Sequence, residues 1–151
     1  MATQLDLFAQ SAHGVGEFHW MLPGWDDRFV QVQAEAAIRE GRQTPPAWTW
    51  PRMQTYNGFD HEARVRGWQI LTVAQRLCLV PLPRRCSICG TTVGQLQSHA
   101  EDYSRPCDAR PVCQSCHRKI HRRHKEAETW RAHIKACSKF WSVPMWFLEL
   151  H

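Results

Sequence analysis

Two closely spaced cysteine pairs constrain the fold of this chain more than any other feature. Cys86 and Cys89 form one C-x2-C pair, Cys113 and Cys116 form a second, and 23 residues separate the two pairs. A C-x2-C turn directs two thiolates to one side, and two such turns complete a tetrahedral site that suits zinc. The sequence therefore predicts one structural zinc ion that holds the C-terminal half together. The glycine after the first pair, Gly90, fits the tight turn of a zinc knuckle.

The remaining cysteines, Cys78, Cys107 and Cys137, have no matching spacing and are expected to be buried apolar residues or bystanders. The first apolar stretch lacks the features of a signal peptide, and no window approaches the roughly 18 apolar residues of a membrane span. We therefore expect an intracellular protein without a membrane partner. Paired cysteines in a reducing compartment indicate metal binding more than disulfides.

Positive charge is concentrated in the cysteine-rich half of the chain. Residues 84–139 carry twelve Lys and Arg against five Asp and Glu, whereas residues 1–83 carry seven against eight. A basic block of this kind favours a polyanion such as nucleic acid. The alternative is a basic face that is merely solvated.

Apolar spacing and helix breakers predict three parts: a flexible tail over 1–24, a helical, tryptophan-rich extension over 25–83, and a zinc domain over 84–151 with a C-terminal helix and tail. One helix is expected within 25–42, ended by Gly41. A second is expected from about Asp60, as its N-cap, to about Leu79.

Helical spacing also predicts which residues face the core. These are Phe29, Val30, Val32, Ala36 and Ile38 in the first helix, and Val65, Trp68, Leu71 and Leu79 in the second. Further helices are expected over 117–124 and 126–139, and the apolar tail over 140–150 is expected to pack back on the domain.

Three histidines lie between and just after the cysteine pairs. On a helix, His117 and His121 would share one face, about 5–6 Å apart at Cβ. With His99 arriving from a strand, three imidazoles can converge on one divalent cation. Taken singly, each histidine would be read as an ordinary surface residue.

The order of these residues over about 84–124 resembles the zinc-stapled branch of the HNH endonuclease family. The resemblance is carried by both cysteine pairs, His99, Asp102-Tyr103, Pro106 and the C-x2-C-H-x3-H ending at His121. It implies an α+β fold in which a small ββα-metal core contains the four-cysteine zinc site. It also implies a bacterial or phage-encoded protein of the cytoplasm that associates with the nucleoid.

The implied activity is hydrolysis of DNA phosphodiester bonds, by an endonuclease or nickase that uses Mg²⁺, Mn²⁺ or another divalent cation. His99, His117 and His121 would bind that cation, and Asp108 stands where the family places its middle Asn or Asp, so it would orient an imidazole or the loop. Candidates for phosphate contacts are Arg105, Arg110, Arg118, Arg122 and Arg123.

The chain departs from the family at the catalytic pair. If the Asp102-Tyr103 segment sets the alignment, His99 is a metal ligand and Ala100 stands where the base is expected, with Glu101 as a substitute base. In the other alignment His99 is the base and Ser98 a poor ligand. The alternative function is therefore a catalytically inactive, zinc-stabilised adaptor that binds DNA or a clamp.

The N-terminal segment Gln4-Leu5-Asp6-Leu7-Phe8 resembles the peptide by which bacterial DNA polymerases and repair proteins dock on the sliding clamp. A flexible tail could present Leu5, Leu7 and Phe8 to an apolar pocket, while Gln4 hydrogen-bonds at its edge. We expect this docking to hold the protein near replicating DNA. The alternative is the first turn of an ordinary helix or strand.

Overall fold

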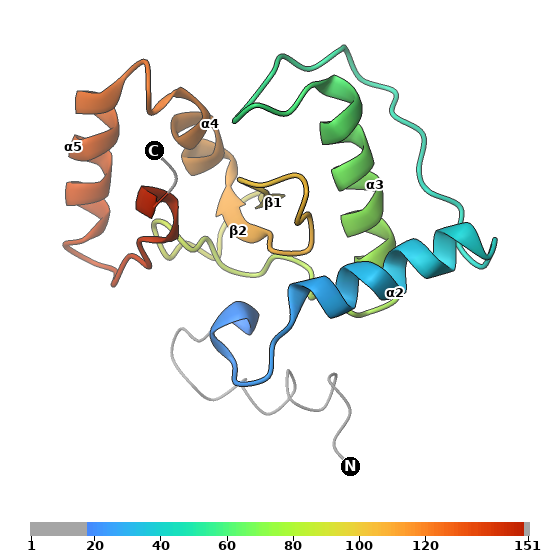
Figure 1. The fold of residues 1–151 in the computed structure, drawn as a ribbon. Coiled ribbons are helices and arrows are strands. Elements are labelled where there is room, and N and C mark those ends of the chain that lie inside the picture. The colour runs from blue at the N-terminus through green and yellow to red at the C-terminus, as the bar shows by residue number, and fades with distance from the viewer. Residues whose placement is uncertain (1–17, 150–151) are drawn as a thin grey trace. The chain divides into compact units, whose positions relative to one another are not determined.

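The structure, a computed structural model, describes residues 18–149. The chain divides into two compact units (Figure 1). Among the described residues, the first comprises 18–81 together with Asp102–Asp108, and the second comprises Leu82–Glu101 and 109–149. The described part contains α-helices and one two-stranded sheet, which confirms the mixed α+β class. Within it, no helix has the length and apolarity needed to cross a membrane.

The first unit is built on the helices α2 (Asp27–Arg39) and α3 (His61–Arg76), which pack on each other, after the short 3-10 helix η2 (His19–Met21). Both α-helices start at an aspartate: Asp26 accepts hydrogen bonds from two backbone N–H groups of α2, and Asp60 accepts one from α3. Such caps stabilise a helix by about 1 kcal/mol. The predicted N-cap Asp60 is thus confirmed, and α3 ends three residues before Leu79.

The core of the first unit matches the prediction in part, since Val30 and Leu71 are buried as predicted. Its buried residues are Val30, Ala34 and Ala37 in α2, and Ile70, Leu71, Val73 and Ala74 in α3. Two predicted core residues, Phe29 and Val32, are each 56% exposed. The prediction was wrong there because α2 carries apolar residues on two faces, and spacing does not tell which face meets α3.

The loop Asp102–Asp108 belongs to the first unit, although it connects the two strands of the second. Its Arg105 donates two hydrogen bonds to the Asp27 carboxylate at the start of α2, Nη2 to Oδ1 at 2.6 Å and Nε to Oδ2 at 3.1 Å. This paired geometry is the strongest that arginine makes with a carboxylate. Cys107 of the same loop is fully buried. The ion pair therefore fixes the loop on α2.

The second unit has the order strand, strand, helix, helix. Strand β1 (Leu96–His99) pairs antiparallel with β2 (Arg110–Cys113), so that Leu96 lies opposite Cys113 and His99 opposite Arg110. Helix α4 (Gln114–Arg122) follows β2 directly, and α5 (Ala127–Cys137) and the 3-10 helix η3 (Trp146–Glu149) complete the unit (Figure 1). Its core contains Cys86, Ile88, Val112, Cys113, Cys116, Ile120, Trp130, Ile134, Cys137 and Phe147.

The C-terminal tail packs back on the first cysteine pair, as expected from its apolar sequence. Trp141 donates from Nε1 to the Ser87 carbonyl at 3.4 Å, and Trp146 donates from Nε1 to the Ser87 hydroxyl at 3.2 Å. Phe147 is fully buried and meets Trp130 edge-on. Phe140, at the start of the tail, is 90% exposed and does not take part in this packing.

Replacing Gly90 with alanine should destabilise the second unit by about 2–4 kcal/mol. Gly90 has a φ of +75°, and an added Cβ would lie 2.6 Å from the Trp141 ring. Alanine would therefore carry both a left-handed backbone cost and a steric overlap. Gly94 is a matched control, because its φ is +85° but nothing lies within 4 Å of an added Cβ. Urea unfolding should show a larger loss for Gly90→Ala than for Gly94→Ala, and equal losses would contradict the packing of Trp141.

Candidate metal centres

The two cysteine pairs lie in turns that aim backbone N–H groups at sulfur. In the first turn, the N–H groups of Ile88 and Cys89 lie 3.4 and 3.5 Å from the Cys86 Sγ atom. In the second, Cys113 ends β2 and caps α4, and its Sγ accepts from the Cys116 N–H at 3.4 Å. N–H groups directed at sulfur favour the thiolate form. Both turns are therefore suited to metal binding.

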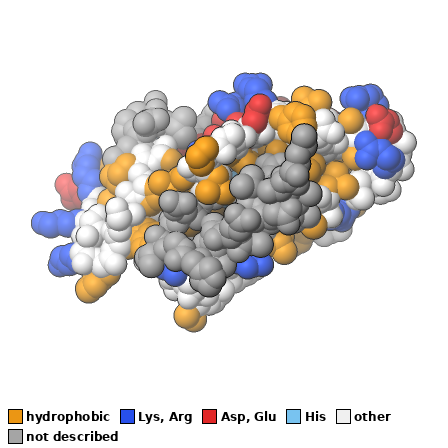
Figure 2. All heavy atoms as spheres, turned by 90° about the horizontal axis from the view of Figure 1, so that it is seen from below, with side chains coloured by type: hydrophobic (Ala, Val, Ile, Leu, Met, Phe, Trp, Pro, Cys, Tyr) orange, Lys and Arg blue, Asp and Glu red, His pale blue; other side chains and the backbone are white. Residues whose placement is uncertain are grey.

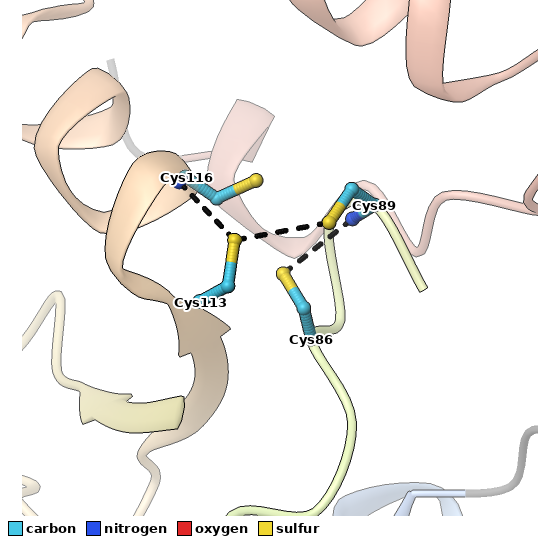
Figure 3. A group of neighbouring side chains, drawn as sticks. All are labelled: Cys86, Cys89, Cys113 and Cys116. Atoms are coloured by element: carbon cyan, nitrogen blue, oxygen red, sulfur yellow. Dashed lines mark hydrogen bonds between the residues drawn. The ribbon is translucent and has the colours of Figure 1, made fainter. Parts of the chain in front are cut away.

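The four sulfurs converge on one point, as Figure 3 shows. The Sγ atoms of Cys86, Cys89, Cys113 and Cys116 all lie within 4.8 Å of one another. Cys89 and Cys113, from different turns, have their Sγ atoms 3.8 Å apart. Tetrahedral zinc with Zn–S bonds of about 2.3 Å also places its sulfurs about 3.8 Å apart. The cluster therefore has the composition and the spacing to hold a zinc ion.

The pKa values of these thiols are shifted apart. The pKa of Cys86 is lowered to about 5, chiefly by the hydrogen bond from the Cys116 thiol. Burial raises the pKa of Cys89 to about 12. The pKa of Cys116 is also raised, chiefly because its proton is shared with Cys86. Without a cation, the cluster therefore keeps protons that metal binding would have to release.

The second centre is formed by His99 at the end of β1 and by His117 and His121 on α4. One nitrogen from each imidazole lies within 4.8 Å of the other two. The Nε2 atoms of His117 and His121 are 3.0 Å apart. Two nitrogens bound to one cation at about 2.1 Å would be about 3.0–3.4 Å apart. A cation-free protein could keep the same distance with an N–H···N hydrogen bond.

Neighbouring side chains fix the direction of two of the imidazoles. The Nδ1 atom of His117 contacts the Gln97 amide oxygen, so this nitrogen carries the proton and Nε2 presents a lone pair toward His121. The His99 Nε2 atom lies 2.6 Å from a Glu101 carboxylate oxygen. Contacts of this kind set the tautomer and the ring orientation of metal-binding histidines.

Glu101, predicted as a substitute base, lies in the interior with both oxygens engaged. One oxygen contacts His99, and the other lies 2.8 Å from the Arg123 guanidinium. Its side chain is 5% exposed. This position favours holding His99 over taking a proton from water. Asp108 lies in the loop of the first unit, where its N–H bonds to the Arg105 carbonyl, and its predicted orienting role remains a prediction.

The arginines predicted to contact phosphate differ in their availability. Arg118 and Arg122 are exposed and Arg110 is half-buried, while Arg122 pairs with Glu126. Arg105 is committed to Asp27. Arg123 is 4% exposed and also donates to the Ile120 carbonyl at 2.8 Å, and this burial leaves no surface for the phosphate contact expected of it. On the face drawn in Figure 2, Lys and Arg side chains form separate groups, some beside acidic ones.

Two residues at these centres were missed in the sequence. Gln97 lies two residues before His99, on the same face of β1, and its amide oxygen contacts the Nδ1 atom of His117 on α4. His133 of α5 places its Nε2 atom 3.2 Å from the Cys116 Sγ atom. Neither belongs to a recognisable spacing. The one available signal for His133 was its position one helical turn before Cys137, on a helix that follows the zinc pairs.

A scan against protein-family models, a search of curated proteins and a search of solved structures find no match to this chain. The HNH resemblance therefore rests on the residues themselves. The predicted clamp-binding segment, residues 4–8, lies outside the described residues.

Proposed function

We propose that this chain is an HNH-type endonuclease or nickase that hydrolyses DNA phosphodiester bonds with a divalent cation. The observation that carries the proposal is the convergence of His99, His117 and His121. They lie on strand β1 and helix α4, which strand β2 connects. The four-cysteine cluster lies next to them in the chain, because Cys113 caps α4 and Cys116 is in its first turn. The order β1, β2, α4 is the one that the family resemblance implies for a ββα-metal core.

The ligand set supports a role at a phosphate. Three imidazoles are neutral ligands, and the buried charges beside them, Glu101 and Arg123, compensate each other. A cation held this way would keep its positive charge for an anionic substrate. When bound, it would neutralise charge that develops on the phosphate and stabilise the leaving 3′ oxygen. The exposed Arg118 and Arg122 of α4 are the candidates for positioning the DNA backbone.

The chemistry of the ligands also bears on which cation is used. Imidazole nitrogens suit zinc, nickel, copper and iron, whereas Mg²⁺ prefers carboxylate and water oxygens. The trio contains no carboxylate, and Glu101 has both oxygens engaged. We therefore expect higher activity with Ni²⁺ or Co²⁺ than with Mg²⁺.

Position 100, where the family resemblance places the base, is occupied by alanine. Ala100 is 7% exposed and has no group to take a proton. Because Glu101 is turned toward Arg123, the alternative to a three-histidine cation site is that His99 acts as the base and that His117 and His121 alone hold the cation. This arrangement favours slow cleavage.

Nicking of supercoiled plasmid across a series of divalent cations tests the proposal. His117→Ala and His121→Ala should lower the rate about 100-fold or more while the protein keeps its zinc content. His124→Ala is the matched control, because this histidine is exposed and lies outside the trio. Equal cutting by wild type and His117→Ala would show that the activity comes from elsewhere.

The same assay distinguishes the proposed nuclease from the alternative function, a catalytically inactive adaptor. An adaptor without catalysis would bind DNA in a salt-dependent manner and cut it under no cation. The alanine at position 100 is the observation that favours it. Recruitment to a sliding clamp by residues 4–8 is compatible with either function and remains a proposal.

A further inference from the structure

Helix α5 brings an unassigned histidine against the four-cysteine cluster. The Nε2 atom of His133 lies 3.2 Å from Sγ of Cys116 and 3.6 Å from Sγ of Cys137. Cys137 is one helical turn beyond His133 on the same helix, whereas Cys116 is on α4. The imidazole is therefore directed at the metal cluster from an element that supplies no metal ligand.

A zinc-bound Cys116 fixes the direction of this contact. A metal-bound thiolate has no proton to give, so a hydrogen bond between the two groups needs the proton on the His133 Nε2 atom. Hydrogen bonds to a charged acceptor are stronger than those to a neutral one. Burial raises the pKa of Cys137, which keeps that side chain a neutral thiol, and its sulfur is also farther away. Cys116 is the better acceptor on both counts.

The other three sulfurs already have backbone donors. Cys86 accepts from the Ile88 and Cys89 N–H groups, Cys113 accepts from Cys116, and Cys89 interacts with the backbone N–H of Thr91. Among the described contacts, His133 is the side chain that provides an N–H to Cys116. Four thiolates around one zinc ion carry a net negative charge in the interior, and donors to sulfur offset it.

We propose that His133 is a positioning residue of the zinc centre, whose Nε2–H donates to the Cys116 thiolate and joins helix α5 to the metal. This inference depends on zinc at the four cysteines and is independent of the proposed nuclease activity. It predicts that loss of the donor weakens zinc binding and makes the Cys116 sulfur more reactive toward alkylating reagents, although all four ligands remain.

Competition with a chromophoric chelator, after elemental analysis has established the zinc content, measures the effect on the full chain. His133→Ala should lower zinc affinity about 10- to 100-fold and speed zinc release by an alkylating reagent. His133→Gln should recover much of the affinity, because its terminal amide keeps an N–H donor near the Nε2 position. His124→Ala and Cys137→Ala should bind zinc like wild type. Wild-type affinity in His133→Ala, or equal losses in the Ala and Gln variants, would overturn the proposal.

A second measurement needs no variant and decides the matter if His133→Ala fails to fold. In wild-type protein loaded with an NMR-active cadmium isotope, the His133 Nε2 proton should show scalar coupling to the metal through the Cys116 sulfur. A His133 ring that carries its proton on Nδ1 alone in the metal-loaded protein would overturn the proposal. Absence of bound zinc or cadmium would instead remove the premise, which elemental analysis detects separately.

Discussion

Removal of zinc is expected to unfold the second unit of this chain. Cys86, Cys113 and Cys116 are part of the unit's small core. Without a cation these thiols keep protons, and the metal–sulfur bonds that would join the two cysteine turns are missing. Structural zinc contributes about 10–16 kcal/mol of apparent binding free energy in small domains, as much as the whole stability of a typical domain. A strong chelator should therefore abolish the circular dichroism contributed by α4 and α5. It should do so more readily at lower pH, because protons compete with zinc for the thiolates.

Cys113→Ser is the sharpest variant for this test. Serine at position 113 can still cap α4, because its hydroxyl can accept from the Cys116 N–H as the sulfur does now. The variant thus removes a zinc ligand while it keeps the local helix signal. Cys78→Ser is the control, since Cys78 is exposed and lies outside the cluster. A Cys113→Ser protein that contains no zinc and melts like wild type would contradict a structural metal.

The parts of the site that sequence could predict are those encoded by local spacing. A C-x2-C turn brings its two thiols to one side, and a helix brings His117 and His121, four residues apart, to one face. In both cases the local backbone fixes the side-chain directions. The cysteine cluster and the histidine trio accordingly converge as expected. The cap at Asp60 was predictable for the same reason.

The parts that could not be predicted depend on which distant residue becomes the partner. Nothing near Arg105 indicates Asp27, which is 78 residues away, and nothing near Arg123 indicates that it is buried against Glu101. In the sequence all the arginines between 105 and 123 look like phosphate ligands. Tertiary packing places Arg105 and Arg123 in ion pairs with acidic residues that are distant in the sequence. Charge composition does not indicate which arginines form such pairs.

Glu101→Gln is expected to destabilise the second unit by about 3–5 kcal/mol, because it leaves the buried Arg123 without its counter-charge. The two side chains are 5% and 4% exposed, and the pair is closed at 2.8 Å. The guanidinium bond to the Ile120 carbonyl does not neutralise the charge. The variant also leaves a neutral amide in place of the carboxylate that contacts His99.

Two comparisons test whether the loss comes from the buried charge of Arg123. Glu62→Gln breaks an ion pair in which Arg52 donates to both carboxylate oxygens, but both side chains are more than 60% exposed, so the unfolding curve should be nearly unchanged. The double variant Glu101→Gln with Arg123→Met removes the stranded charge and should recover part of the stability lost in Glu101→Gln alone. Urea unfolding of the zinc-loaded proteins measures all three. If Glu101→Gln costs no more than Glu62→Gln, the buried charge of Arg123 does not depend on Glu101 for its stability, and the expected effect of burial is contradicted.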